Sequence, residues 1–153
     1  MLAKIIKFLL IIVLMGIIFS FSNDTGSAST KKSDSVIVTI TEKFLGRELT
    51  SSEKEKYIDK FVVLVRKSGH LFIYLLLGLS IISFLKEFMI IDTKSVIITC
   101  IIVFIYACSD EVHQLYVSGR SGEALDVIID TIGGFIGSYL YYLIYKYRRK
   151  RNG

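Results

Sequence analysis

Residues 96–116, with the sequence VIITCIIVFIYACSDEVHQLY, decide how this chain folds. The apolar part ends after 13 residues, at position 108. A helix that crosses the hydrocarbon core of a bilayer needs about 20 residues. Extending the helix through the polar residues 109–114 to about residue 116 restores a full span. The same extension places two acids, a histidine and a glutamine at membrane depth.

The rest of the chain has the composition of a membrane protein. It has 153 residues, of which 52% are hydrophobic and 22% charged, and the mean hydropathy is +0.57. The apolar residues form long runs, whereas those of a soluble domain are spread periodically. We therefore predict an all-α membrane protein, a single membrane domain over residues 1–153 with a bundle of four transmembrane helices. The expected spans are about 5–21, 69–85, 96–116 and 126–146.

Charge and cysteine content exclude other classes. The net charge of +5 raises the question of nucleic-acid binding, but long apolar runs rich in aromatic residues do not suit that function. Two cysteines, eight residues apart in an apolar helix, exclude a disulfide scaffold and a zinc finger. Inert packing is the expected role of both. We expect membrane lipids as partners and no nucleic acid.

The basic residues predict the orientation. The tail over residues 146–151, KYRRKR, is the densest positive segment and is flanked by tyrosines. Positive residues favour the cytoplasmic side of a membrane and tyrosines favour its interfaces. We therefore expect a multi-pass protein of the cell membrane with both termini in the cytoplasm. The first run could instead be a signal peptide, but it is long for that role.

Between the first two spans lies a long segment, residues 22–68, expected on the outer side. Val36, Ile40 and Phe44 recur four residues apart, as on one face of a helix. Thr50 and Glu53 have the spacing of a capping box, which predicts a second helix. We expect amphipathic helices here that lie on the outer membrane surface or cap the bundle.

Ionisable residues inside a bilayer are costly and usually pair or line a cavity. Helical spacing predicts which of them meet, because residues three or four apart share a face. The second span then has one face with Arg66, His70 and Tyr74, and the third span has one with Asp110, His113 and Gln114. The expected outer ends of the last three spans and one glycine-rich turn carry such residues, and we expect them to converge on one patch: Arg66, Lys67, His70, Tyr74, Asp110, Glu111, His113, Gln114, Arg120, Asp126 and Asp130.

These residues also carry a resemblance to a known family. The segments Arg66–Tyr74 (RKSGHLFIY) and Asp110–Gln114 (DEVHQ), the turn GRSG at 119–122 with Asp126, and the pair Gly133 and Gly137 occur in this order, after the FSFS exit of the first helix. In these features the chain resembles the VanZ-like family of bacterial membrane proteins, which implies the same membrane topology. The family is associated with resistance to teicoplanin-type glycopeptides. Asp130 stands where the family commonly has asparagine, so this acid needs a cation, a proton or an arginine partner.

Several of these groups have purely structural alternatives. His70 could face lipid headgroups, and Gln114 could make only an interhelical hydrogen bond. Asp110 could form a structural ion pair with Arg120. More broadly, we expect Arg120 to neutralise acids of the third and fourth spans, namely Asp110 or Glu111 together with Asp126. Gly133 and Gly137 are spaced for close helix packing.

The favoured function is a protein of the cell envelope whose polar outer-leaflet pocket binds a lipid-linked or cell-surface ligand. The ligand would be a lipid-linked cell-wall precursor or a glycopeptide. All residues of the patch except His113 are expected to bind it. The arginines and Lys67 would attract its phosphate or carboxylate. This interpretation requires no cofactor and no metal. The alternative is a membrane hydrolase or transferase with Glu111 or Asp110 as base and His70 or His113 as acid. A third is a divalent metal site among the same acids and histidines.

Overall fold

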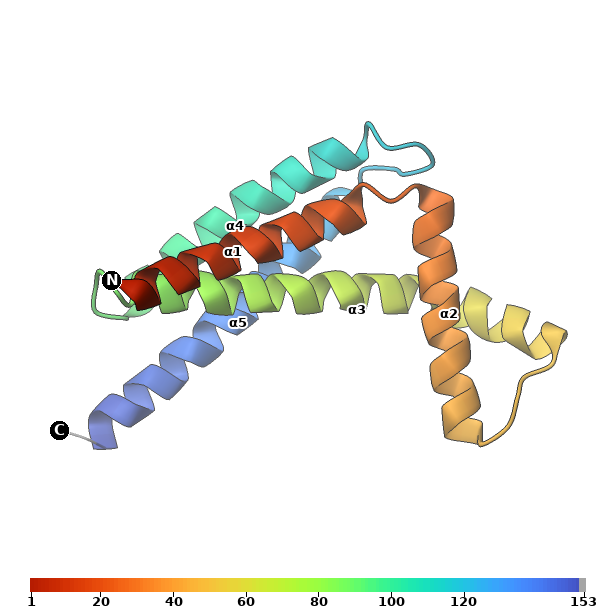
Figure 1. Ribbon diagram of the computed structural model, residues 1–153, viewed down its shortest axis with the longest axis horizontal. Coiled ribbons are helices and arrows are strands. Elements are labelled where there is room, and N and C mark those ends of the chain that lie inside the picture. Colours follow the sequence, from red (N-terminus) through yellow and green to blue (C-terminus); the bar gives the residue numbers. More distant parts are fainter. Residues whose placement is uncertain (152–153) are drawn as a thin grey trace.

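The computed structural model describes residues 1–151, which form five α-helices and no strand (Figure 1). Four of the five are long and apolar enough to cross a membrane. The prediction of an all-helical chain with four such helices is confirmed. The helices are α1 (Leu2–Ser22), α2 (Gly26–Leu45), α3 (Ser51–Leu85), α4 (Thr93–Gln114) and α5 (Ala124–Arg151), and α2 is the one outside the set of four.

Local sequence explains where the helices begin and end. The Thr50 and Glu53 capping box opens α3 as predicted, and Asp92 with Ser95 forms another at the start of α4. Gly46 closes α2 in the left-handed conformation, with φ of 66°. The last turn of α5 holds only basic residues in its final four positions, which suits the negative end of the helix dipole.

The third span confirms the decisive prediction of the sequence. α4 continues past Ser109 and ends at Gln114, two residues before the predicted end. Asp110, Glu111 and Gln114 are buried, with 4%, 8% and 4% of their surface exposed. The polar stretch therefore belongs to the helix and faces the interior of the bundle.

Residues 22–68 differ from their prediction at the second helix. The helix that begins at Thr50 does not end before the second span but runs through it as α3, 35 residues without a break. At 1.5 Å per residue it is about 52 Å long, far more than the roughly 30 Å of a hydrocarbon core. The chain has no proline, and a single helical glycine such as Gly69 is tolerated. The two elements expected as separate are therefore one helix.

Glycines allow α3 and α5 to pack in close contact. A methyl group added at Gly133 or Gly137 of α5 would overlap the backbone carbonyl oxygen of Leu71 or Leu75, respectively. Gly78 of α3 lies equally close to the backbone of Gly134. The expectation of close helix packing at the glycine pair is confirmed.

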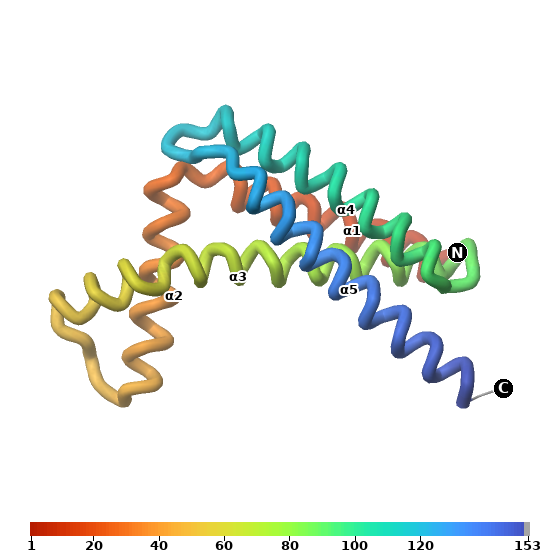
Figure 2. The backbone as a smooth tube through the Cα atoms, turned by 180° about the vertical axis from the view of Figure 1, so that it is seen from behind, coloured from red at the N-terminus to blue at the C-terminus, as the bar shows by residue number. Residues whose placement is uncertain are grey.

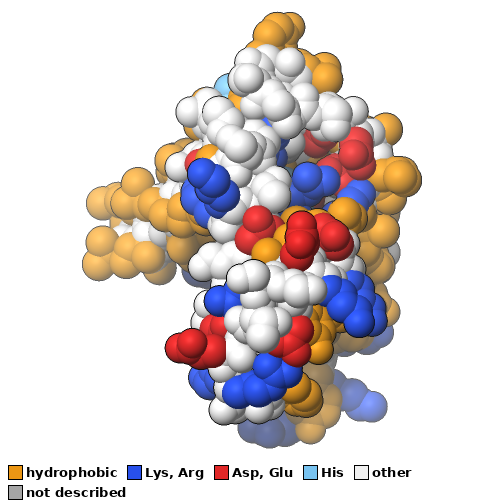
Figure 3. Space-filling model, turned by 90° about the vertical axis from the view of Figure 1, so that its right-hand side faces the viewer, with side chains coloured by type: hydrophobic (Ala, Val, Ile, Leu, Met, Phe, Trp, Pro, Cys, Tyr) orange, Lys and Arg blue, Asp and Glu red, His pale blue; other side chains and the backbone are white. Residues whose placement is uncertain are grey.

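The helices are arranged so that one end of the bundle is polar. The start of α1 and the end of α5 lie at the same end, and α2 and the loop after α4 lie at the other (Figures 1 and 2). α2 runs across the extended part of α3 in both views. Seen from the end that carries α2, charged side chains of both signs gather over the molecule, and apolar surface flanks them (Figure 3).

Apolar side chains fill the centre of the bundle and also cover its outside. The main core joins α1, α3 and α4 through buried residues that include Ile18, Leu77 and Val103. On the outward faces, Phe8 is 50% exposed and Ile105 is 62% exposed. Large apolar side chains with this exposure require lipid around the helices.

Candidate functional site

Two buried acids and a partly buried histidine, from three helices, meet near the polar end of the bundle. His70 of α3 and Asp130 of α5 face each other, with 3.5 Å between His70 Nδ1 and Asp130 Oδ1. Asp110 of α4 completes the group, and one nitrogen or oxygen of each residue lies within 4.8 Å of the others. Asp130 is 1% exposed. Its nearest charged partner is thus the histidine and not an arginine.

Tyr74 and Gln114 border this group. Tyr74 lies one turn after His70 on α3, is fully buried, and has Asp110 and Asp130 as the acids nearest its hydroxyl. Asp110 Oδ2 accepts hydrogen bonds from Ser22 Oγ at 2.8 Å and from Gln114 Nε2 at 3.3 Å. The predicted shared faces therefore agree with the structure for His70 with Tyr74 and for Asp110 with Gln114, whereas His113, expected on the latter face, stacks on Phe19. Gln114 forms hydrogen bonds within its own helix and to the following loop. The hydrogen bond between helices that was expected of Gln114 is formed instead by Ser22.

Arg120 does not have the predicted role. Its Nε and Nη2 atoms donate to the backbone carbonyl oxygens of Asp24 and Phe21, at 2.9 and 2.6 Å, and Nη1 donates to Gln114 Oε1 at 2.9 Å. Within residues 1–151 it forms no ion pair with an acid. The carbonyls at the carboxyl end of a helix lack partners in the helix and carry partial negative charge. Arg120 binds the end of α1 for this reason, and both the predicted neutralisation of acids and the alternative Asp110–Arg120 ion pair are wrong.

Lys67 provides the neutralisation that Arg120 does not. Its Nζ lies 2.8 Å from Asp126 Oδ1 and 3.3 Å from Glu123 Oε2, and it joins α3 to the start of α5. The side chains of Lys67 and Asp126 are 24% and 15% exposed. This pair is therefore partly shielded from solvent and holds two spans together at the polar end.

Two of the predicted catalytic candidates point elsewhere. Glu111 accepts a hydrogen bond from the backbone N–H of Glu123 just before α5. His113 stacks on Phe19 of α1, with 4.5 Å between the ring centroids. Neither residue lines the two cavities beside His70. Sequence spacing placed all four candidates at one level of the membrane, but the structure brings together only His70 and Asp110.

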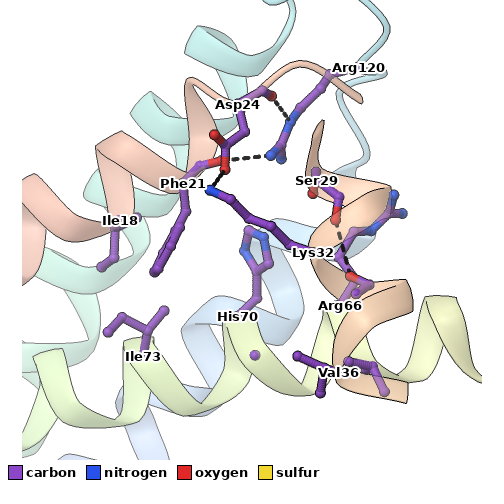
Figure 4. Close-up of a pocket in the computed structure, with 13 residues that line it drawn as sticks. Ile18, Phe21, Asp24, Ser29, Lys32, Val36, Arg66, His70, Ile73 and Arg120 are labelled. Atoms are coloured by element: carbon purple, nitrogen blue, oxygen red, sulfur yellow. Dashed lines mark hydrogen bonds and ion pairs between the residues drawn. The ribbon is translucent and has the colours of Figure 1, made fainter. Parts of the chain in front are cut away.

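An apolar cleft of about 270 Å³ opens between α1, α2 and α3. Ile18, Phe21 and Ile73 form one side of it, and His70 projects from α3 into its centre (Figure 4). Cationic side chains border it, namely Lys32, Arg66 and Arg120. Burial lowers the pKa of the Arg120 guanidinium from its ordinary value, but arginine stays charged in proteins.

A smaller polar cavity of about 130 Å³ adjoins this cleft. Gln114, Ser121 and Asp126 line it from the far side. Four residues line both spaces, namely Ser29, Arg66, His70 and Arg120. Arg66 has no hydrogen-bond or ion-pair partner within residues 1–151, in contrast to Arg120 and Lys67. One unpaired guanidinium therefore stands between an apolar and a polar space.

Three residues of the site were missed by sequence reasoning. Ser22 at the end of α1 was noted only as part of the family pattern, yet it binds Asp110. Asp24 and Lys32 pair with each other at the mouth of the cleft. The spacing of these polar residues within a Ser/Thr-rich segment does not predict their contacts. The partner of Ser22 lies 88 residues further along the chain, and the contact of Asp24 with Lys32 depends on how α2 is placed.

The comparisons with known proteins identify the family. No curated protein and no solved structure matches this chain. A family model described as VanZ/LLP1 matches residues 7–145, which cover most of each of the four helices suited to span a membrane and every residue of the site. The chain is therefore a multi-pass membrane protein that belongs to the VanZ/LLP1 family.

Proposed function

We propose that this protein binds a membrane lipid with a phosphate headgroup, such as a lipid-linked cell-wall precursor, in the cleft between α1, α2 and α3. The observation that carries the proposal is Arg66, an unpaired guanidinium on the border between the apolar cleft and the polar cavity. Arginine binds phosphate through two parallel hydrogen bonds. An alkyl chain in the cleft and a headgroup at Arg66 match the chemistry of the two spaces.

The size of the spaces fits part of a lipid. Ligand pockets commonly measure about 300–1,000 Å³, and the cleft with its polar neighbour measures about 270 and 130 Å³. A second apolar cleft of about 420 Å³ lies between α2 and α3, with Phe44 and Phe61 in its wall. Val65 lines both clefts and so places them side by side along α3. The bound lipid would lay a chain along this helix.

The contacts of the candidate acid and base residues favour ligand binding over catalysis. Glu111 and His113, two of the four candidates for acid and base, are engaged in contacts outside the cavities. The alternative of a membrane hydrolase or transferase would have to rely on His70 and Asp110 alone. Binding of a phosphate by Arg66 requires no catalytic acid or base, and the position of Arg66 therefore supports a binding protein.

The test uses the purified protein in detergent and follows helix unfolding by circular dichroism. Dihexanoyl phosphatidic acid should raise Tm, and dihexanoyl phosphatidylcholine at the same concentration should not. Arg66→Gln should remove the effect, whereas Arg149→Gln, which changes an exposed arginine of the tail, should keep it. Equal shifts with both lipids, or an unchanged shift in Arg66→Gln, would reject the proposal. Polyprenyl monophosphate, as a third ligand, distinguishes a cell-wall carrier lipid from a phospholipid.

Orientation and physiology complete the proposal. The basic tail supports both termini in the cytoplasm, which puts the cleft in the outer leaflet. In a background where Cys100 and Cys108 are replaced by serine, an impermeant thiol reagent should label S27C from outside and not K150C. If the family's association with teicoplanin applies, expression should raise the inhibitory concentration of teicoplanin, and Arg66→Gln should remove that rise at equal protein level.

A further inference from the structure

Four polar atoms in the group around His70 are buried and lack a hydrogen-bond partner within residues 1–151. They are Nδ1 of His70, Oδ1 of Asp110, Oδ1 of Asp130 and the hydroxyl of Tyr74. Buried polar side-chain atoms nearly always have a partner in the protein or in bound solvent. His70 Nδ1 and Asp130 Oδ1 face each other at 3.5 Å without forming a hydrogen bond, and Asp110 Oδ1 and the Tyr74 hydroxyl lack one as well. A further group held in this volume would satisfy these atoms.

Charge points to a cation. Asp110 and Asp130 are 4% and 1% exposed. Of the positive side chains nearby, Lys67 and Arg120 bind other groups, and Arg66 forms no ion pair with either acid within residues 1–151. Lys67 pairs with Glu123 and Asp126, and Arg120 binds Gln114 and two backbone carbonyls. His70 is the single basic group within 4 Å of either carboxylate in the described part of the chain. Two buried carboxylates with one histidine lack positive charge, which makes an uncompensated state unfavourable.

We propose that His70, Asp110 and Asp130 bind a divalent transition-metal ion, Zn²⁺ or Mn²⁺, with the Tyr74 hydroxyl at its edge. One imidazole nitrogen and two carboxylate oxygens form a mixed donor set that suits these ions better than Mg²⁺ or Ca²⁺, which take oxygen ligands. The site shares His70 with the wall of the lipid cleft, whereas Asp110 and Asp130 line neither cavity, and metal binding is measured here without lipid.

The geometry is close to that of a metal site. In a tetrahedral site, two ligand atoms that are each about 2.1 Å from Zn²⁺ are about 3.4 Å apart. The three ligand atoms are within 4.8 Å of one another, and the His70–Asp130 pair is already at 3.5 Å. The His70–Asp130 pair thus already has the required spacing, and a movement of Asp110 by at most about 1.4 Å brings all three into coordination range.

Neighbouring residues orient the ligands. Ser22 and Gln114 both bind Oδ2 of Asp110, which leaves Oδ1 directed away from them and free. Hydrogen bonds of this kind fix the ligands of metal sites. His70 lines both cavities, so an ion can approach its imidazole from the polar cavity.

The experiment measures metal binding to the full-length protein in detergent, without lipid ligand or activity. After treatment with EDTA and its removal, Mn²⁺ is titrated and the free ion is followed by electron paramagnetic resonance. Zn²⁺ is tested by competition and by the change in Tm. The expected result is one tightly bound Mn²⁺ per chain, displaced by Zn²⁺ and not by equal concentrations of Mg²⁺ or Ca²⁺.

Variants then locate the ion. His70→Gln and Asp130→Asn should each weaken Mn²⁺ binding by about 100-fold or more, since loss of a ligand exceeds the 10–100-fold effect of losing a supporting residue. His113→Gln, which changes the second histidine of the chain, and Asp59→Asn, at an exposed acid of α3, should leave it unchanged.

Two outcomes would overturn the proposal, and the first of them needs no variant. One is the absence of stoichiometric Mn²⁺ or Zn²⁺ binding to the wild-type protein. The other is Mn²⁺ binding by the wild-type protein that His113→Gln or Asp59→Asn weakens. If no ion binds and Asp130→Asn raises Tm, a proton neutralises the acids and the metal site is rejected.

Discussion

The guanidinium of Arg120 and the side-chain amide of Gln114 are joined by a hydrogen bond of 2.9 Å from Nη1 to Oε1. Gln114 Nε2 in turn donates to Asp110 Oδ2. With its other nitrogens Arg120 binds carbonyls at the end of α1. The loop after α4 is thereby connected to α1 on one side and to the buried acids on the other.

Arg120→Ala should therefore destabilise the protein through loss of contacts to α1. Hydrogen bonds from a charged group contribute about 1.5–3 kcal/mol each, and we expect a loss of about 2–4 kcal/mol because solvent replaces part of them. Arg120→Lys should recover a minor part, since one ammonium cannot reach three acceptors in a fixed fork. Thermal unfolding followed by circular dichroism checks this, with Arg149→Ala as control. Full stability of Arg120→Ala would contradict it.

The contact of α3 with α5 should be sensitive to a single methyl group. Gly137→Ala places that methyl against the Leu75 carbonyl, and overpacking of this kind costs about 1–3 kcal/mol. Gly16→Ala is the matched control, because nothing lies within 4 Å of a methyl at that position. Melting temperatures of the two variants in the same detergent provide the measurement. Equal values would show that the helices are not in close contact at Gly137.

Lys67 should act as an electrostatic link between α3 and α5. Lys67→Glu places a third acid beside Glu123 and Asp126 and should lower Tm by several degrees. Combining it with Asp126→Lys restores one pair of opposite charge and should recover part of the loss. A double-mutant cycle of the two single variants and the double variant measures the coupling. Strict additivity would mean that the two residues do not interact.

At the opposite end, Lys7 of α1 hydrogen-bonds to Glu87 in the loop before α4. This bond holds the pKa of Glu87 below its usual value. A carboxyl whose pKa is lowered on folding adds stability above the pKa of the unfolded chain and loses it as pH falls through the lowered value. The Tm difference between the wild-type protein and Lys7→Gln should thus be largest at neutral pH and shrink below about pH 4. Lys31→Gln, at an exposed position of α2, should show no such trend.

Much of the fold follows from periodicity and length. The need for a span of about 20 residues correctly extends α4 through Asp110 to Gln114. Spacing along single helices correctly pairs His70 with Tyr74 and Asp110 with Gln114. Both inferences rest on geometry within one helix, which the sequence contains.

Contacts between elements could not be predicted in the same way. The direction in which the 115–123 loop folds decides that Arg120 meets α1 and that Lys67 meets Asp126. Rotation of α4 about its axis decides that His113 stacks on Phe19 while Asp110 faces His70. The polar residues were correctly expected at one end of the bundle, but their partners depend on these two arrangements.

The central claim is that a lipid phosphate binds at Arg66 with its chain in the cleft between α1, α2 and α3. The direct measurement uses a phosphatidic acid with a photoreactive acyl chain, incorporated into nanodiscs with the protein, and maps the cross-links by mass spectrometry. The account predicts adducts concentrated on cleft residues such as Ile18 and Ile73, reduced about tenfold or more in Arg66→Gln through loss of a charge-assisted bond. Adducts spread evenly over outward side chains such as Ile105, and unchanged in Arg66→Gln, would contradict it.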